Sequence, residues 1–366
     1  MKPKQNINLY KITKGEITMK KFITALILVL SLCLISGCAP KDVNEQGNKP
    51  GAENNSDQPV VNIIDEKDAE IEEFFSKYVD TDSRPVAVMI DNDDKSARPQ
   101  AGLDEAYLVY EMVVEGGSTR FMALYNNTNI EKIGPVRSSR HYFLDFVMEN
   151  DAIYTHFGWS PQATTDISSF GINNINGVLG SDGHIFWREE KYKGDWHSAY
   201  TNMEKILKIA EDKNYNLTTK HKNSIKYADK YFDLDSSKNA TKIILNYSYN
   251  YKTGYEYNEG KKVYSKIVDN KIYKMQNSNP VEFKNIIIEL IHDTALGDGT
   301  ARRNINTVGT GKGYYITNGQ VEEITWSKSS RRANTVYKKN DGSELVINPG
   351  KTIINLISPS YELVIE

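Results

Sequence analysis

The pattern of apolar and polar positions predicts a mixed helix-and-strand region over residues 84–225. Residues 86–90 form a continuous apolar run, VAVMI, which is typical of a strand buried on both faces. A second buried strand is predicted over residues 152–157. Helices are predicted over 139–149, from Ser160-Pro161 to Gly171, and from the capping box of Thr201 and Glu204 to about Lys213. Strands that alternate with helices favour an α/β or α+β fold for this region.

A hairpin is predicted where strands over residues 107–115 and 119–125 flank a Gly-Gly pair. A loop of two or four residues would put Arg120 on the same face as Glu111 and Glu115, because side chains alternate along a strand. Only a loop with an odd number of residues would separate the guanidinium from these carboxylates. The expected cluster is either functional or a solvated ion-pair face.

Beyond residue 240 the helical patterns fade, and the chain predicts a β-rich region over 240–366, a sandwich or a barrel. Strands are predicted over residues 242–251, 255–267, 283–292, 313–317, 322–326, 335–338 and 352–357. Asn-Gly at 318–319 and Asp-Gly at 341–342 predict hairpin turns. The run GTGKG at 309–313 lacks the spacing of a phosphate-binding loop and predicts a β-turn.

Tyrosine is unusually frequent, with 23 Tyr against 11 Phe. Tyr247, Tyr249 and Tyr251 alternate, so they are predicted to share one face of a strand. Such a row can stack on sugar rings, but a half-buried sheet face that packs the rings and wets the hydroxyls is the favoured interpretation.

The chain begins with the pattern of a secretory signal. Lys20 and Lys21 precede a mostly apolar run over residues 22–35, which is short for a membrane span. Ser36-Gly37-Cys38 then resembles the bacterial lipobox. Residues 1–37 are therefore predicted to be a removed signal peptide, with a diacylglyceryl group on Cys38 as the contact with the membrane. The alternative is a plain signal peptide with an incidental cysteine, and Met19 is an alternative start for either.

Residues 38–83 are expected to connect this anchor to the folded body. Residues 39–59 are polar and rich in Asn, Gly and Pro, which predicts a disordered tether with an average span of roughly 25 Å. Residues 63–79 fit a short amphipathic helix or, equally, more linker. The predicted location is therefore the extracytoplasmic face of the cell membrane.

The charge balance excludes some partners. Residues 1–37 contain six Lys or Arg and one Glu, so removing them from the totals of 45 and 48 leaves 39 basic and 47 acidic residues. The resulting net charge of −8 argues against nucleic-acid binding and against a polybasic attraction to anionic lipid. Any anion site must be local. Removal of the signal also takes away Cys33, so a lipidated Cys38 leaves no cysteine for a disulfide.

Two arginines stand where a helix is predicted to begin. In IGPVRSSRHYFLDF, residues 133–146, Ser138 or Ser139 can cap the helix and Arg137 and Arg140 lie beside them. Backbone N–H groups, the helix dipole and two planar guanidinium groups would then favour a phosphate or carboxylate. The alternative is an internal carboxylate as the partner, and both hold if that carboxylate occupies an empty ligand site. The predicted ligand-binding set is Asp91, Asn92, Arg98, Arg120, Arg137 and Arg140.

Glu111, Glu115, His156 and His197 are the candidate acid–base groups. A lone histidine is more often a hydrogen-bonded structural residue than a catalytic one, so both roles stay open. No HExxH motif, cysteine cluster or EF-hand loop is present, and neither a metal nor a cofactor is expected. A serine nucleophile has no G-x-S-x-G elbow.

Taken together, these segments resemble the YerB-like lipoproteins, a bacterial family of unknown function, over nearly the whole predicted body. The resemblance rests on RPVAVMIDN at 84–92, ARPQAGL at 97–103, VYEMVVEGG at 109–117, TRF at 119–121, IGPVRSSR at 133–140, DA at 151–152, His156, FWR at 186–188, His197, TVGTGKG at 307–313 and ITWSK at 324–328. The family's usual Pro-His-Asn before Tyr-Thr is here Trp196-His197-Ser198, followed by Ala199. The resemblance implies a two-domain lipoprotein outside a Gram-positive-type membrane and no known reaction.

Three hypotheses follow. The first is a binding lipoprotein whose cleft takes a cell-wall glycan or peptide ligand, either a peptidoglycan stem carboxylate or a polymer phosphate, with Glu115 orienting Arg120. The second is an envelope hydrolase or transferase with Glu115 or His156 as general base and the arginines stabilising an oxyanion. The third is a scaffold protein of an envelope assembly, which would present an apolar surface of its β-rich region.

Overall fold

The computed structural model describes residues 66–366 except 128, 223, 236–237 and 250. The predicted signal peptide, Cys38 and the tether lie outside the described residues. None of the helices in the described part of the chain is long and apolar enough to cross a membrane.

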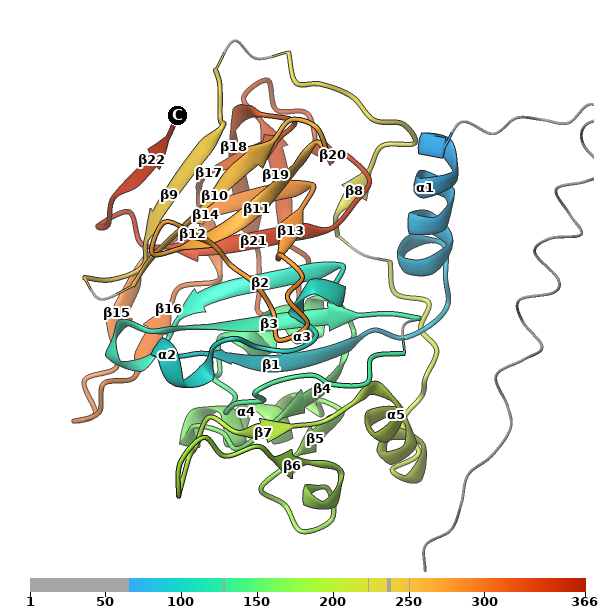
Figure 1. Cartoon of the computed structure of the whole chain (residues 1–366), viewed down its shortest axis with the longest axis vertical. Coiled ribbons are helices and arrows are strands. Elements are labelled where there is room, and N and C mark those ends of the chain that lie inside the picture. Colours follow the sequence, from blue (N-terminus) through green and yellow to red (C-terminus); the bar gives the residue numbers. More distant parts are fainter. Residues whose placement is uncertain (1–65, 128, 223, 236–237, 250) are drawn as a thin grey trace, which may run out of the picture. The chain divides into compact units, whose positions relative to one another are not determined.

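One ten-stranded sheet connects the early and late parts of the chain (Figure 1). In sheet order its first five strands are β19 (Val336–Lys339), β18 (Gln320–Lys328), β17 (Gly309–Thr317), β14 (Asn285–Leu290) and β21 (Thr352–Ile357). The order continues with β2 (Leu108–Val113), β3 (Thr119–Tyr125), β1 (Val86–Asn92), β4 (Ile153–His156) and β5 (Asn174–Asn176).

The two parts meet where β2 pairs with β21. The pairing is parallel and sets Leu108 opposite Thr352 and Met112 opposite Leu356. The apolar side chains of these strands are buried, as expected for strands covered on both faces. A mixed α/β part followed by a strand-rich part confirms the predicted fold class. The predicted boundaries at 84–225 and 240–366 stay predictions.

The segment before α3 (Phe143–Glu149) differs from the expectation. The helix begins after Tyr142, which provides no side-chain cap, so the prediction that Ser138 or Ser139 caps it was wrong. Backbone pairing explains the difference: Arg137 N donates to Met89 O, and Ser139 N donates to Gly158 O. The arginine segment is therefore an extended strand-like stretch beside β1, and its two arginines do not stand at the N-terminus of α3.

The other predicted helices are present with one change of cap. α4 (Pro161–Phe170) has Ser160 Oγ accepting from Ala163 N at 3.3 Å and ends at Gly171, as predicted. α5 (Met203–Asp212) is capped by Asn202, one residue later than the predicted Thr201. α1 (Glu66–Phe74) and the π-helical turn Phe75–Val79 occupy the stretch predicted as helix or linker.

A second sheet covers the strand-rich part. Its order is β12 (Lys271–Ile272), β11 (Val263–Val268), β10 (Lys252–Asn258), β9 (Lys242–Asn246) and β22 (Leu363–Ile365), and β13 (Glu282–Phe283) pairs with β11. The predicted single strand 255–267 is thus a hairpin. Asn258 Oδ1 accepts from Lys261 N at 3.1 Å, which favours a turn at this point.

Buried tyrosines join the two sheets. Tyr247 and Tyr255 donate their hydroxyls to Asn355 Oδ1 of β21 at 3.1 and 2.8 Å. The ring packing predicted for Tyr247 and Tyr251 is confirmed, since both are buried, but the expectation of wet hydroxyls was wrong: Tyr247 donates to Asn355, and Tyr251 accepts from Asn92. The prediction that the three tyrosines share one face of a strand was also wrong, because β9 ends at Asn246 and Tyr249 is fully exposed in the turn that follows.

The GTGKG run at 309–313 also differs from its prediction. It forms the first half of β17 rather than a β-turn. A Cβ on Gly311 would lie 2.4 Å from Trp326 Nε1 on the neighbouring strand, so glycine is needed for close approach within the sheet.

Candidate functional site

The loop between β2 and β3 has five residues, 114–118, and this odd length sets the register. Arg120 lies opposite Met112, and Thr119 lies opposite Val113. Arg120 is therefore on the face opposite to Glu111, and the predicted shared face was wrong. Glu115 lies within the loop itself, and its Oε2 still comes within 3.8 Å of Arg120 Nη2.

On its other edge, β3 pairs with β1 and brings Asp91 directly opposite Arg120. The next pair, Asn92 and Thr119, points to the other face, because neighbouring side chains alternate. The adjacent residues Asp91 and Asn92, predicted to share one cleft, thus belong to two different sites.

The Asp91 face opens into a pocket of 330 Å³. We call it the arginine pocket; its lining residues are Asp91, Asp93, Val114, Glu115, Arg120, Arg137, Arg140, Thr300 and Arg302. Four guanidinium groups and three carboxylates therefore border one small space. Of the predicted residues, the structure brings Asp91, Glu115, Arg120, Arg137 and Arg140 together here, and His197 does not line the pocket but contacts Asp91.

Arg140 and Glu115 form the most complete ion pair of the pocket. Arg140 Nε and Nη2 donate to the two carboxylate oxygens of Glu115 at 2.6 and 2.8 Å, and Arg140 Nη1 donates to Ser139 O. Burial alone would raise the pKa of Glu115, but its bond to Arg140 and the charges of Arg140 and Arg120 lower it. Glu115 is therefore an ionised partner held in place, which fits a binding role better than that of a general base.

Asp91 is the buried anion at the base of the pocket. Its Oδ2 lies 3.1 Å from Arg137 Nε and 2.7 Å from His197 Nδ1. Burial acts to raise the pKa of Asp91, but the His197 hydrogen bond and the Arg120 and Arg137 charges lower it overall. The same hydrogen bond raises the pKa of His197 above its usual value. This mutual stabilisation holds the loop of residues 189–198 against β1.

Arg120 and Arg302 are less completely paired. Arg120 is 6% exposed, donates Nη1 to Ser138 O at 2.6 Å, and reaches Glu115 only at 3.8 Å. Its Nε has no hydrogen-bond partner among the described residues. Burial and the neighbouring Arg140 charge lower the Arg120 pKa to about 10. Arg302 lies 3.9 Å from Glu115 and 3.5 Å from Asp298.

The sequence pattern did not predict Arg302 as a site residue, because Arg302 belongs to the strand-rich part of the chain. It lies just before β16 (Arg303–Ile305), which pairs with β15 (Asp293–Ala295) in a projecting hairpin. Arg303 holds this hairpin through Asp293, with Nε to Oδ2 at 2.8 Å. The polar run DGTARR at 298–303 was the available signal, but its position in the chain gave no reason to connect it with Arg137.

The opposite face of β1 carries a separate buried network. Glu111 Oε2 lies 2.8 Å from Lys266 Nζ of β11, and both side chains are fully buried. Asn92 Nδ2 donates to Glu111 Oε1 at 3.2 Å, and Arg98 Nε donates to Asn92 Oδ1 at 3.1 Å. Arg98 also lies over the Tyr251 ring at 4.8 Å. The structure therefore places three predicted site residues, Asn92, Arg98 and Glu111, outside the arginine pocket.

His156 is likewise not a lining residue of the arginine pocket. It is fully buried on β4, with Nδ1 2.8 Å from Gly158 O and Nε2 3.3 Å from Asn174 Oδ1. Burial lowers the pKa of His156 to about 4, so the ring is neutral at pH 7. These contacts support a structural role. Among the described residues, no cluster of three His, Cys, Asp or Glu side chains is arranged to hold a metal ion.

Comparison with known proteins places this architecture in a described family. Residues 76–216 match the model of the N-terminal domain of DUF3048, described as a protein of unknown function, and residues 243–354 match the model of its C-terminal domain. The chain therefore belongs to the DUF3048 family.

The chain is similar in sequence to a protein named "Putative lipoprotein YerB" of Bacillus subtilis (strain 168). It is 33% identical over 344 residues, which cover 93% of this chain and 96% of the relative. The crystal structure of the YerB protein from Bacillus subtilis superposes with a TM-score of 0.69 at 32% identity, covering 78% of this chain and 94% of that one. The YerB-like resemblance of the sequence is confirmed.

Proposed function

We propose that this chain is a lipid-anchored extracytoplasmic protein that binds an anionic ligand of the cell envelope in the arginine pocket. The observation that carries the proposal is the incomplete pairing of Arg120 and Arg302. Their carboxylate contacts are all 3.5 Å or longer, and Arg120 Nε has no hydrogen-bond partner among the described residues. A buried guanidinium group with unused donors is costly unless an anion completes its hydrogen bonds.

The chemistry of the donors limits the ligand. Planar guanidinium groups bind carboxylate and phosphate oxygens in pairs, and here they come from three separate segments around one space. The volume of 330 Å³ is at the lower end of small-molecule sites, so the pocket fits a terminal group rather than a length of polymer. A stem-peptide carboxylate of peptidoglycan or a phosphate of a wall polymer has this chemistry.

The sequence and the relative's name support the proposed location. Cys38 directly after Ser36-Gly37 fits lipid attachment at the start of a polar tether. The YerB relative is named as a lipoprotein. A protein anchored in this way would meet wall components but no nucleic acid.

The test is thermal melting of the compact unit, residues 62–366, with inorganic phosphate, acetate and soluble peptidoglycan fragments. A ligand at 100 times its Kd stabilises the folded state by about 2.7 kcal/mol, which raises Tm. Arg137→Ala/Arg140→Ala should lose the shift, and Arg332→Ala, outside the arginine pocket, should keep it. Absence of any shift from the whole panel in a folded wild type would refute the proposal.

The second candidate is an envelope hydrolase or transferase, and one contact favours it. Asp91 orients His197 through Nδ1, which is the arrangement that a general base requires. The general bases predicted from the sequence are less suitable. Glu115 is held by Arg140, and His156 is buried as a neutral ring. Incubation of the binding ligand with wild type and His197→Gln separates the two functions. Turnover that needs His197 supports the enzyme, and binding without turnover supports the binder.

A further inference from the structure

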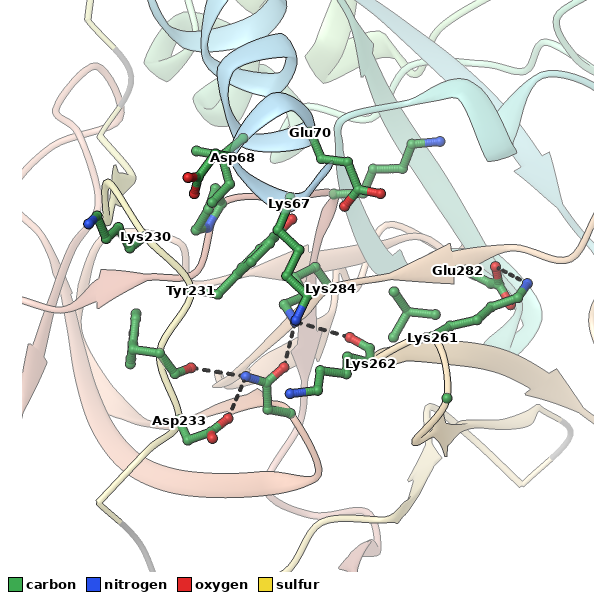
Figure 2. A pocket seen from close by; sticks show the side chains of 18 of the residues that line it. Lys67, Asp68, Glu70, Lys230, Tyr231, Asp233, Lys261, Lys262, Glu282 and Lys284 are labelled. Atoms are coloured by element: carbon green, nitrogen blue, oxygen red, sulfur yellow. Dashed lines mark hydrogen bonds and ion pairs between the residues drawn. The ribbon is translucent and has the colours of Figure 1, made fainter. Parts of the chain in front are cut away.

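A second pocket lies between α1 and loops of the strand-rich part (Figure 2). Its volume is 1310 Å³, and it shares no lining residue with the arginine pocket. We call it the lysine pocket, after the lining residues Lys67, Lys230, Lys261, Lys262, Lys284 and Lys351. Apart from the adjacent Lys261 and Lys262, these lysines come from separate segments, so folding rather than a basic run in the sequence gathers them.

Lys284 differs from the other lysines because it is buried, at 8% exposure. Its ammonium donates to Asn318 Oδ1 at 2.5 Å and to Lys262 O at 3.2 Å. Figure 2 draws the hydrogen bonds of Lys284 as dashed lines. The Tyr231 ring centre lies 4.7 Å away. Among the described residues, no carboxylate is within ion-pair distance of this ammonium. Its hydrogen bonds go to neutral acceptors, and its charge has no direct partner.

A buried charge without a counter-charge is unfavourable, and this cost lowers the pKa of Lys284. Burial and then the charge of Lys262 lower the pKa of Lys284 to about 8. The charges of Asp233 and Glu70 raise this pKa, and the charge of Lys67 lowers it. At pH 7 the ammonium is still mostly protonated, so a single anionic group beside it would be strongly stabilised.

The acidic residues of the lysine pocket restrict what kind of anion can enter. Asp68 and Glu70 on α1, Asp104 and Glu105, Asp233 and Glu282 also line it. Glu282 already neutralises Lys261 at 3.1 Å. A polyanion would be repelled by these carboxylates, whereas a ligand with one anionic end and amide or amino groups along its length would be matched. The pocket is also larger than the roughly 300–1,000 Å³ typical of small-molecule sites.

We propose that the lysine pocket binds a short peptide by its free terminal carboxylate, with Lys284 as the group that receives the carboxylate. The acidic residues on α1 and at 104–105 accept hydrogen bonds from the peptide's amide and amino groups. This site does not depend on the arginine pocket, because the two have no lining residue in common.

The test uses the full chain in detergent and isothermal titration calorimetry with three probes: acetyl-trialanine with a free carboxylate, its terminal amide, and acetate. The free acid should bind at least tenfold more tightly than either the amide or acetate. Lys284→Met keeps the apolar stem and should lose this difference. Lys339→Met is the control, because that lysine lies outside the lysine pocket and already pairs with Glu322 at 3.3 Å, and it should bind within twofold of wild type.

A second measurement decides the case in which Lys284→Met does not fold. The wild-type lysines are labelled as 13C-dimethylamines, and the Lys284 resonance is titrated with pH. Addition of the free-acid peptide should raise the pKa of Lys284, because a carboxylate favours the ammonium. Equal binding of acid and amide, equal binding of acetate and peptide, a resonance that does not respond, or loss of binding in Arg137→Ala/Arg140→Ala would each overturn the proposal.

Discussion

Arg140 holds Glu115 through two parallel hydrogen bonds, with Nε to Oε1 at 2.6 Å and Nη2 to Oε2 at 2.8 Å. Glu115 comes from the loop after β2, and Arg140 comes from the extended stretch before α3. The pair ties these two segments together across the arginine pocket. It also means that a carboxylate of the protein itself occupies guanidinium donors that an anionic ligand would use.

The first prediction concerns Glu115, whose carboxylate would compete with an anionic ligand for these guanidinium donors. Glu115→Gln removes one negative charge from the arginine pocket and leaves Arg140 and Arg120 without their shared carboxylate. Phosphate should then bind about tenfold more tightly, which corresponds to about 1.4 kcal/mol. Loss of a partly exposed bidentate pair should lower the free energy of unfolding by about 1 kcal/mol. Calorimetric titration with inorganic phosphate and urea unfolding measure the two effects.

Glu204→Gln, an exposed change on α5, is the control for a general effect of net charge. It should alter phosphate affinity by less than about twofold, because exposed distant charges are screened by salt. If Glu115→Gln weakens phosphate binding, Glu115 is a ligand-positioning residue, and the competitor interpretation is wrong.

Local patterns predicted the elements that form this region. The apolar run at 86–90, the Ser160-Pro161 start of α4 and its Gly171 end all depend on neighbouring residues and appear as expected. The two arginines were also recognisable as cations that need negative charge. These features are encoded over a few residues, where backbone geometry and capping decide the outcome.

Tertiary pairing decided the features that could not be predicted. The Gly-Gly pair gave no way to distinguish a four-residue from a five-residue loop, and that single residue moved Arg120 away from Glu111. Arg302 and Lys266 are both far in sequence from the residues they approach. Their partners depend on the β2–β21 pairing and on sheet packing, for which one sequence carries no local signal.

The second prediction concerns the buried pair of Lys266 and Glu111. Their 2.8 Å contact is fully buried, so Lys266→Met should leave an unpaired carboxylate and cost about 4 kcal/mol of unfolding free energy. Adding Glu111→Gln should recover more than half of that loss, because the amide oxygen still accepts from Asn92 and Thr119. Urea unfolding of wild type, both single variants and the double variant gives the coupling energy. Additive losses in the double variant would contradict this account.

The third prediction concerns Glu289 on β14, which accepts from Tyr337 Oη at 2.6 Å. Burial raises the pKa of Glu289 to about 7, although the Tyr337 hydrogen bond lowers it. Because the folded state favours the protonated acid, wild type should lose stability as pH rises from about 4.5 to 7, by about 3 kcal/mol. Glu289→Gln should differ from wild type by less than about 1 kcal/mol at pH 5 and be clearly more stable at pH 8.

Urea midpoints at the two pH values test this, with the exposed Glu259→Gln as the control. The difference between Glu289→Gln and wild type should be several times larger at pH 8 than at pH 5, and the control should show no such change. A constant difference would mean that Glu289 has a similar pKa in the folded and unfolded states.

The last prediction concerns the contact between His197 and Asp91. The hydrogen bond to Asp91 raises the pKa of His197 in the folded state, so its stabilising effect is complete below about pH 6.5 and is lost as pH rises through the raised pKa. The pKa of Asp91 is lowered instead, so its contribution is present above about pH 4 and is lost as pH falls through the lowered value.

His197→Gln should therefore destabilise the protein most near pH 5.5, by about 2 kcal/mol, the value typical of a hydrogen bond to a charged group. The deficit should shrink towards alkaline pH, as the pH rises above the raised pKa of His197 and the ring becomes neutral in both states. Urea unfolding across this range measures it, and the exposed His184→Gln should follow wild type throughout. A deficit that grows with pH would show that neutral His197, and not its ionic contact with Asp91, holds the loop of residues 189–198 against β1.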